Sequence, residues 1–199
     1  MMKDITSNEI KALLIIFKDI KKKYNANNLS KILGITPMGT LKILKGLEKD
    51  NILAPEKLGK ATFYKINFKS HYAKSYLRFF LEKEAQHSPP RVKAKLEDLK
   101  NFSSCAEISI LFGSILKSEN FNDIDVLLVL KNNQVKKCNK ITEEIEKISS
   151  KTVHIIKQTP EDLRQNLQKS DKVVLEIIKT GIVIFGQDKI IEVIENVSN

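Results

Sequence analysis

The feature that most constrains the fold is a pair of apolar runs joined by a glycine turn and a short polar insert. The first run ends in Gly113-Ser114, and the second covers residues 123–130 and opens with the alternating acids Asp123 and Asp125. Because side chains alternate between the faces of a strand, the two carboxylates are predicted to share one face, while the residues between them face a core. Two carboxylates beside a glycine turn are suited to a divalent cation and the phosphates that it neutralises.

The pattern of Gly-Ser, eight residues and Asp-x-Asp between apolar strands resembles the nucleotidyltransferases of the DNA polymerase β superfamily, especially its minimal prokaryotic members. The resemblance implies that Gly113 and Ser114 bind the phosphates of ATP or another NTP, and that Asp123 and Asp125 bind Mg²⁺. Glycine lets backbone N–H groups approach a phosphate closely, and Lys117 supplies positive charge nearby. The implied reaction is in-line attack on the α-phosphorus, with pyrophosphate leaving.

Two positions depart from the family pattern. Small members usually carry an arginine directly after Gly-Ser, where this chain has Ile115. The family's third carboxylate, on the next strand, corresponds to His154 in the apolar run of residues 153–156. A histidine can accept a proton from an attacking hydroxyl near neutral pH, but it is a poor magnesium ligand beside two acids. His154 is therefore a candidate catalytic residue together with Asp123 and Asp125, and nucleotide binding without turnover stays open as the alternative.

Charge is divided unevenly along the chain. Residues 1–100 hold 21 Lys and Arg against 10 Asp and Glu, whereas residues 101–199 hold 13 against 14. The net charge of +10 is therefore carried by the first half, which predicts a polyanionic partner for that half and a different role for the second.

Several classes of protein are excluded by composition. No apolar run approaches the roughly 20 residues that cross a bilayer. The N-terminal Met-Met-Lys-Asp lacks the apolar segment of a signal peptide, and Cys105 and Cys138 form neither a disulfide framework nor a zinc spacing. We therefore expect a cytoplasmic protein with reduced thiols and no membrane partner.

The first seventy residues carry the pattern of three helices followed by two short strands. Apolar spacing and capping residues predict helices over about residues 7–22, over residues 29–33 and from Thr36 onward, then strands at residues 52–54 and 62–68. This order resembles the winged helix-turn-helix of MarR-like and ArsR-like regulators. In that fold the third helix enters the DNA major groove and the wing contacts the backbone or minor groove.

The resemblance implies a double-stranded DNA partner, contacted by the third helix and the wing. The residues assigned to this contact are Thr36, Met38, Leu41, Lys42 and Lys45 on the helix, and Lys57 and Lys60 on the wing. Lysines suit phosphates or guanine edges, and the apolar side chains suit thymine methyl groups. The alternative is a protein-interaction module whose lysines are merely solvated.

The predicted fold class is α+β with three parts. Residues 1–70 are the winged helix-turn-helix, residues 71–100 a helical connector with an aromatic stripe suited to packing or homodimerisation, and residues 101–199 a mixed α/β nucleotidyltransferase-like domain. Two functions remain open. One is a DNA-binding nucleotidyltransferase that modifies a protein or small molecule. The other is a transcriptional regulator whose transferase-like domain is inactive and senses nucleotide or mediates assembly.

Overall fold

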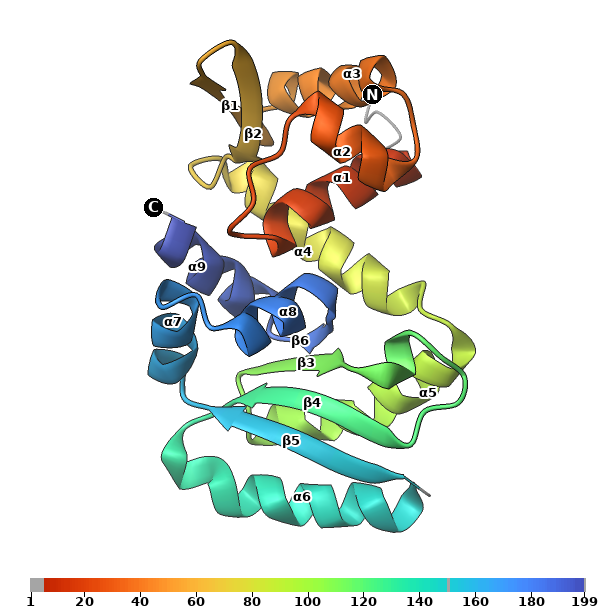
Figure 1. Cartoon of the computed structure of the whole chain (residues 1–199). Coiled ribbons are helices and arrows are strands. Elements are labelled where there is room, and N and C mark those ends of the chain that lie inside the picture. The colour runs from red at the N-terminus through yellow and green to blue at the C-terminus, as the bar shows by residue number, and fades with distance from the viewer. Residues whose placement is uncertain (1–5, 150, 199) are drawn as a thin grey trace. The chain divides into compact units, whose positions relative to one another are not determined.

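The computed structural model describes residues 6–149 and 151–198, which form two compact units (Figure 1). The first unit is Met1–Phe80 and the second is Leu81–Asn199. Helices and strands occur in both units, so the expected α+β class is confirmed. Among the described residues, no helix is both long enough and apolar enough to span a bilayer.

The first unit contains three helices followed by an antiparallel ribbon of two strands. The elements are α1 (Ser7–Lys18), α2 (Ala26–Leu33), α3 (Pro37–Lys49), β1 (Leu53–Leu58) and β2 (Ala61–Ile66). Helix α1 is shorter than the apolar spacing predicts, because the backbone leaves the helical region at Asp19. Strand β1 is longer than predicted, because its pairing with β2 continues to Leu58 opposite Ala61 and leaves only Gly59-Lys60 in the turn.

Helix ends in this unit are fixed by capping residues. Thr6 accepts a hydrogen bond from the Glu9 N–H, and the Glu9 carboxylate accepts one from the Thr6 N–H, which is a reciprocal capping box at the start of α1. Thr36 accepts from the Gly39 N–H at the start of α3. Gly34, with φ 68°, ends α2 in the left-handed conformation that glycine adopts without steric cost.

Helix α4 (His71–Gln86) carries a ladder of aromatic rings. The Tyr72 and Tyr76 ring centroids are 4.4 Å apart and their hydroxyl groups are hydrogen-bonded at 2.6 Å. Tyr76 and Phe80 pack edge to face with centroids 5.5 Å apart. Tyr72 and Phe79 remain exposed. The division between the two units falls within this helix, inside the stretch of residues 71–100 predicted as a connector.

A four-stranded mixed sheet forms the centre of the second unit. Its strands are β3 (Ile108–Phe112), β4 (Asp123–Val129), β5 (Thr152–Gln158) and β6 (Ile182–Phe185), in the order β5-β4-β3-β6. β4 pairs parallel with β5 and antiparallel with β3, and β3 pairs antiparallel with β6. The helices around the sheet are α5 (Pro90–Leu99), α6 (Val135–Ile148), α7 (Pro160–Gln168), α8 (Lys172–Thr180) and α9 (Gln187–Ser198).

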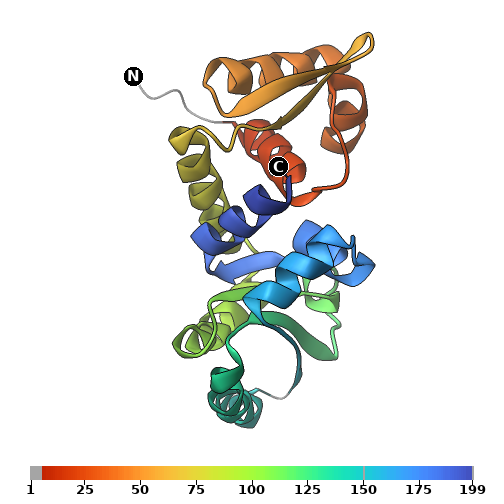
Figure 2. The same cartoon turned by 90° about the vertical axis from the view of Figure 1, so that its left-hand side faces the viewer.

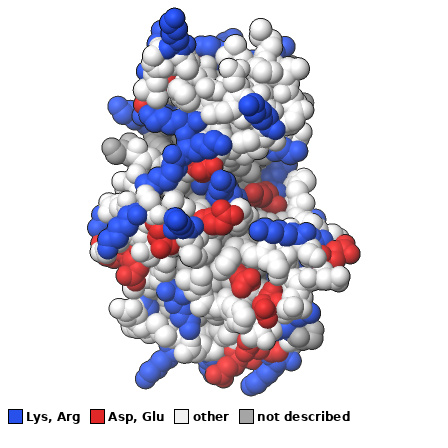
Figure 3. All heavy atoms as spheres, in the orientation of Figure 1, with Lys and Arg blue, Asp and Glu red and all other residues white. Residues whose placement is uncertain are grey.

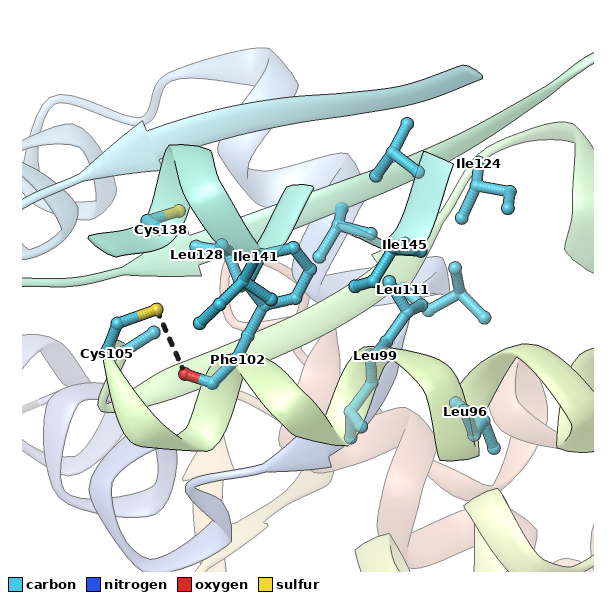
Figure 4. Packing of buried hydrophobic residues seen from close by; sticks show 14 of the residues in the cluster. Leu96, Leu99, Phe102, Cys105, Leu111, Ile124, Leu128, Cys138, Ile141 and Ile145 are labelled. Atoms are coloured by element: carbon cyan, nitrogen blue, oxygen red, sulfur yellow. Dashed lines mark hydrogen bonds between the residues drawn. The ribbon is translucent and has the colours of Figure 1, made fainter. Parts of the chain in front are cut away.

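Helices α5 and α6 cover one face of this sheet, and α7, α8 and α9 lie on the other side (Figures 1 and 2). The core under α5 and α6 contains Leu96, Ile141, Ile124 and Leu128, all buried (Figure 4). Since residues alternate along β4, the residues on either side of Ile124 point to the opposite face. That alternation positions the acids of the candidate site.

The two cysteines lie in the same core as free thiols (Figure 4). The Cys105 S–H donates a hydrogen bond to the Phe102 carbonyl oxygen at 3.3 Å. Burial raises the pKa of Cys105 to about 11 and also raises the pKa of Cys138. Both thiols are therefore neutral packing groups near pH 7.

Candidate nucleotide and metal site

The glycine turn after β3 has a backbone conformation that other residues avoid. Gly113 adopts φ 86° and ψ −155°, a region that is essentially exclusive to glycine. A Cβ atom at this position would overlap the Asp125 carboxylate, whose Cγ lies 2.9 Å from the place that the Cβ would occupy. The turn and the acid are thus in direct contact, and the contact requires glycine.

A single 3-10 turn, η2 (Ser114–Leu116), follows the glycine. The Ser114 carbonyl accepts hydrogen bonds from the N–H groups of Lys117 and Ser118, at 2.9 and 3.0 Å. Ile115 buries its side chain in the core, whereas the side chains of Ser114 and Lys117 are exposed. The turn is therefore anchored by Ile115 and presents a hydroxyl and an ammonium group to solvent.

Strand register brings the other candidate residues to the same face of the sheet. Asp125 lies opposite Phe112 of β3 and beside His154 of β5, and Asp123 lies beside Thr152. Side chains that are paired across strands point to the same face. Accordingly, His154 Nδ1 is 3.7 Å from Asp125 Oδ1. Sequence spacing alone did not identify Phe112 and Thr152 as neighbours, because that requires knowledge of the register.

The charge of Asp125 is poorly compensated. Its side chain is 25% exposed, and burial raises its pKa. The charge of Asp123 adds to the upward shift, while His154 opposes it. A raised carboxyl pKa means that the surroundings disfavour the ionised form. A cation held by both acids would reverse that penalty.

The two acids fit magnesium as part of a shared coordination sphere. Within residues 6–149 and 151–198, no group of three or more His, Cys, Asp or Glu side chains is arranged to hold a metal ion. Mg²⁺ is commonly bound through one or two carboxylates, with water and substrate phosphates in the other positions. Asp123 and Asp125 meet that requirement, and the absence of a side chain at Gly113 lets the backbone of the turn lie directly against the Asp125 carboxylate. His154 is better suited to proton transfer than to magnesium binding.

One further cation reaches the turn from a distant part of the sequence. Arg91, in the first turn of α5, donates from Nε to the Ile115 carbonyl oxygen at 3.2 Å. Its Nη1 lies 3.8 Å from the carboxylate of Glu119. Sequence spacing indicated Lys117 near the turn and not Arg91, because no local spacing links α5 to η2.

The family model described as Polymerase beta, Nucleotidyltransferase matches residues 95–190, just under half of the chain. Residues 95–190 are a polymerase beta nucleotidyltransferase domain. The match includes the Gly113 turn, both acids and His154, so the predicted domain type of the C-terminal half is confirmed. The matched range begins after Arg91, within α5.

Comparisons of the whole chain add little to this. No curated protein matches it. Two solved structures, both of mutants of Lactococcus lactis ZitR, are similar at 14% and 11% sequence identity. The first similarity covers 51% of this chain and 64% of that chain with a TM-score of 0.35, and the second covers 74% and 78% with a TM-score of 0.33. Likenesses of this size carry no conclusion about the first unit.

Outside the nucleotidyltransferase domain, the residues predicted to contact DNA on α3 differ in exposure. Met38 is 74% exposed, and Lys42 and Lys45 are exposed, whereas Leu41 is half-buried. Lys45 Nζ lies 2.9 Å from the Glu48 carboxylate, which raises the pKa of the lysine. A phosphate at Lys45 would therefore compete with Glu48 for the ammonium group.

The other predicted contacts lie at the start of α3 and on the ribbon. Thr36 is exposed while its hydroxyl caps α3. Lys57 is exposed on β1, and Lys60 is exposed in the two-residue turn. On the face drawn in Figure 3, acidic side chains gather mainly over the second unit, and the first unit shows Lys and Arg among uncharged residues. The charge asymmetry of the sequence is thus visible on the surface.

Proposed function

We propose that this protein is a DNA-binding nucleotidyltransferase. The second unit binds ATP or another NTP with Mg²⁺ and transfers a nucleotide to a protein or small molecule, and the first unit binds double-stranded DNA as a winged helix-turn-helix. The observation that carries the proposal is the contact between the Gly113 turn and the partly buried Asp125 carboxylate, because it places a metal-binding group directly beside backbone that can approach a phosphate closely. The family match over residues 95–190 supports it.

Each residue of the site has a separate role in this proposal. Asp123 and Asp125 hold Mg²⁺, which when bound offsets phosphate charge and polarises the α-phosphorus. The backbone at Gly113 and the exposed Ser114 hydroxyl bind phosphate oxygens, and Lys117 adds positive charge. The sheet face supplies the rigid support, since Asp125 is fixed between β3 and β5.

His154 acts as the proton acceptor. It stands beside Asp125 with its side chain 59% exposed, so that an acceptor hydroxyl can approach it from solvent. The hydroxyl oxygen forms a bond to the α-phosphorus and its proton passes to His154. The bond between the α-phosphorus and the bridging oxygen breaks, and pyrophosphate leaves with the electron pair. The Asp125 carboxylate stabilises the resulting imidazolium.

Nucleotide transfer is tested with ATP labelled at the α-phosphate, Mg²⁺ and cell extract. We expect the wild type to label an acceptor, and Asp123→Asn and Asp125→Asn to abolish labelling. Glu143→Gln removes the same charge from an exposed position on α6 and should label as the wild type does. ATP labelled at the γ-phosphate should give no product, since that phosphate leaves in pyrophosphate. Transfer that persists in both acid variants would refute the proposal.

A second candidate function rests on His154 itself. A histidine in place of a third acid is compatible with a transcriptional regulator whose domain binds nucleotide without turnover. Calorimetric titration with a non-hydrolysable ATP analogue and Mg²⁺ distinguishes the two functions when combined with the labelling assay. Tight binding in the absence of any label transfer, with DNA affinity that changes on nucleotide addition, would favour the regulator.

DNA binding and homodimerisation complete the proposal. Lys42, Lys57 and Lys60 are exposed cations on the two elements that a winged helix-turn-helix uses against DNA. The exposed Tyr72 and Phe79 of α4 provide apolar surface for a second copy of the chain. A symmetric dimer would match a palindromic DNA site.

A further inference from the structure

The position of Arg91 is not explained by the stability of its own helix. It lies in the first turn of α5, where the helix dipole disfavours a cation. That turn contains no acidic residue, and the preceding Pro89 makes no side-chain capping hydrogen bond. The arginine side chain is nevertheless only 25% exposed. Its interactions with other parts of the unit must therefore account for its placement.

Those interactions are concentrated on the backbone that follows Gly113. Arg91 Nε donates to the Ile115 carbonyl at 3.2 Å. The preceding carbonyl, of Ser114, is already engaged by two N–H groups. The ion pair with Glu119 is weak in comparison, because its 3.8 Å separation is long and the Glu119 side chain is 90% exposed. The main effect of Arg91 is therefore on η2.

Arg91 approaches η2 from the side of the sheet that α5 covers. Its neighbour Val92 is buried in the core cluster that contains Ile124 and Val126. Asp123 and Asp125 alternate with those residues and point to the other face. Among the described residues, no hydrogen bond or ion pair joins Arg91 to either acid, so its contact with the turn is through the Ile115 carbonyl.

We propose that Arg91 is a positioning residue that holds the Gly113-Ser114 turn in its phosphate-binding conformation. This inference rests on the proposed nucleotide binding by the same turn. The guanidinium fixes the Ile115 carbonyl while the Ile115 side chain anchors the other side of η2 in the core. With both held, the Ser114 hydroxyl and the backbone at Gly113 are oriented before the nucleotide arrives. Preorganisation of this kind improves affinity, because less ordering is needed on binding.

The test compares variants of Arg91 by calorimetric titration with ATP and Mg²⁺, using the full chain. Arg91→Gln should weaken nucleotide binding about ten-fold, the size expected from loss of one charge-assisted hydrogen bond. Arg91→Lys keeps the charge and one donor and should recover part of the affinity. Glu119→Gln should bind as the wild type does. Lys95→Gln is the matched control, since Lys95 lies one turn further along α5 and pairs with Asp98 and Ser149.

Amide hydrogen exchange separates positioning from general stability. Arg91→Gln should speed amide exchange at residues 114–118 and leave the exchange rates of α6 unchanged. If Arg91 only stabilised the fold, the variant would have a lower melting temperature but would bind nucleotide normally at temperatures where it is folded. If the wild type binds ATP and Arg91→Gln binds it with the same affinity, the role of Arg91 is overturned and the proposed function is not. Failure of the wild type to bind ATP would overturn the proposed function and the role of Arg91 with it.

Discussion

Replacing Gly113 with alanine imposes two costs that the geometry separates. The first is conformational, since φ 86° and ψ −155° cost a residue with a Cβ about 1–3 kcal/mol. The second is steric, because the added methyl group overlaps the Asp125 carboxylate, and overpacking typically costs about 1–3 kcal/mol. We therefore expect Gly113→Ala to lower the free energy of unfolding by roughly 2–6 kcal/mol.

A double-mutant cycle isolates the contact with the acid. In the Asp125→Ala background the carboxylate is absent, and the nearest remaining atom is the residue 125 Cβ, 3.1 Å from the new methyl group. The conformational cost and a smaller steric cost should then remain, so the coupling free energy between the two positions should be about 1–3 kcal/mol. Urea unfolding followed by circular dichroism, without Mg²⁺, measures all four corners of the cycle.

Gly186→Ala is the matched control. Gly186 also has φ 86°, and a Cβ there would meet the backbone of Glu107 and Ile108 rather than an acid. Its cost should be the same with and without the Asp125 carboxylate. If Gly113→Ala costs equal amounts in the two backgrounds, the contact between the turn and Asp125 does not exist as described, and the site loses its main support.

Three further predictions concern charge and assembly. Because burial raises the folded-state pKa of Asp125, the stability that this group contributes falls as pH rises from its unfolded pKa through its folded pKa. In thermal melts without Mg²⁺, Asp125→Asn should make that fall shallower. The same variant should lose the stabilisation that Mg²⁺ gives the wild type at pH 7. The double variant Lys42→Ala/Lys45→Ala should bind duplex DNA more weakly in fluorescence anisotropy. Its slope of log affinity against log salt concentration should be shallower by about two. An unchanged slope would show that neither lysine contacts DNA phosphates. Phe79→Glu should convert a dimer into a monomer in sedimentation analysis, whereas Ile148→Glu, at another exposed apolar position, should stay dimeric. A monomeric wild type would refute the dimer proposal.

Local features were predictable from the sequence because they depend on a few neighbouring residues. The alternation of Asp123 and Asp125 with apolar residues predicted both the strand and its buried face, and the structure has Ile124 fully buried. Thr36 marked the start of α3 through its capping side chain, and Thr159 caps α7 in the same way. These signals need no knowledge of the tertiary fold, since each capping bond spans three residues.

Features that depend on pairing between distant segments were not predictable in the same way. The neighbourhood of Asp125 and His154 follows from the parallel register of β4 and β5, which a single sequence does not specify. The contact of Arg91 with Ile115 joins segments 24 residues apart and follows no periodic pattern. The first strand of the ribbon was predicted too short, at residues 52–54, whereas its pairing with β2 continues through Pro55 to Leu58.

The lengthwise pattern of β4 has a consequence for folding as well as for chemistry. On the face away from α5, the strand begins with Asp123 and Asp125 and continues with the buried Leu127 and Val129. A slip of two residues against β3 would preserve the inside–outside alternation, so hydrophobic patterning alone would permit it. Such a slip would move a carboxylate into the apolar half of that face, and burying an unpaired charge costs several kcal/mol or more. The acids therefore also select the strand register, and apolar substitution of both should produce a sheet with more than one pairing.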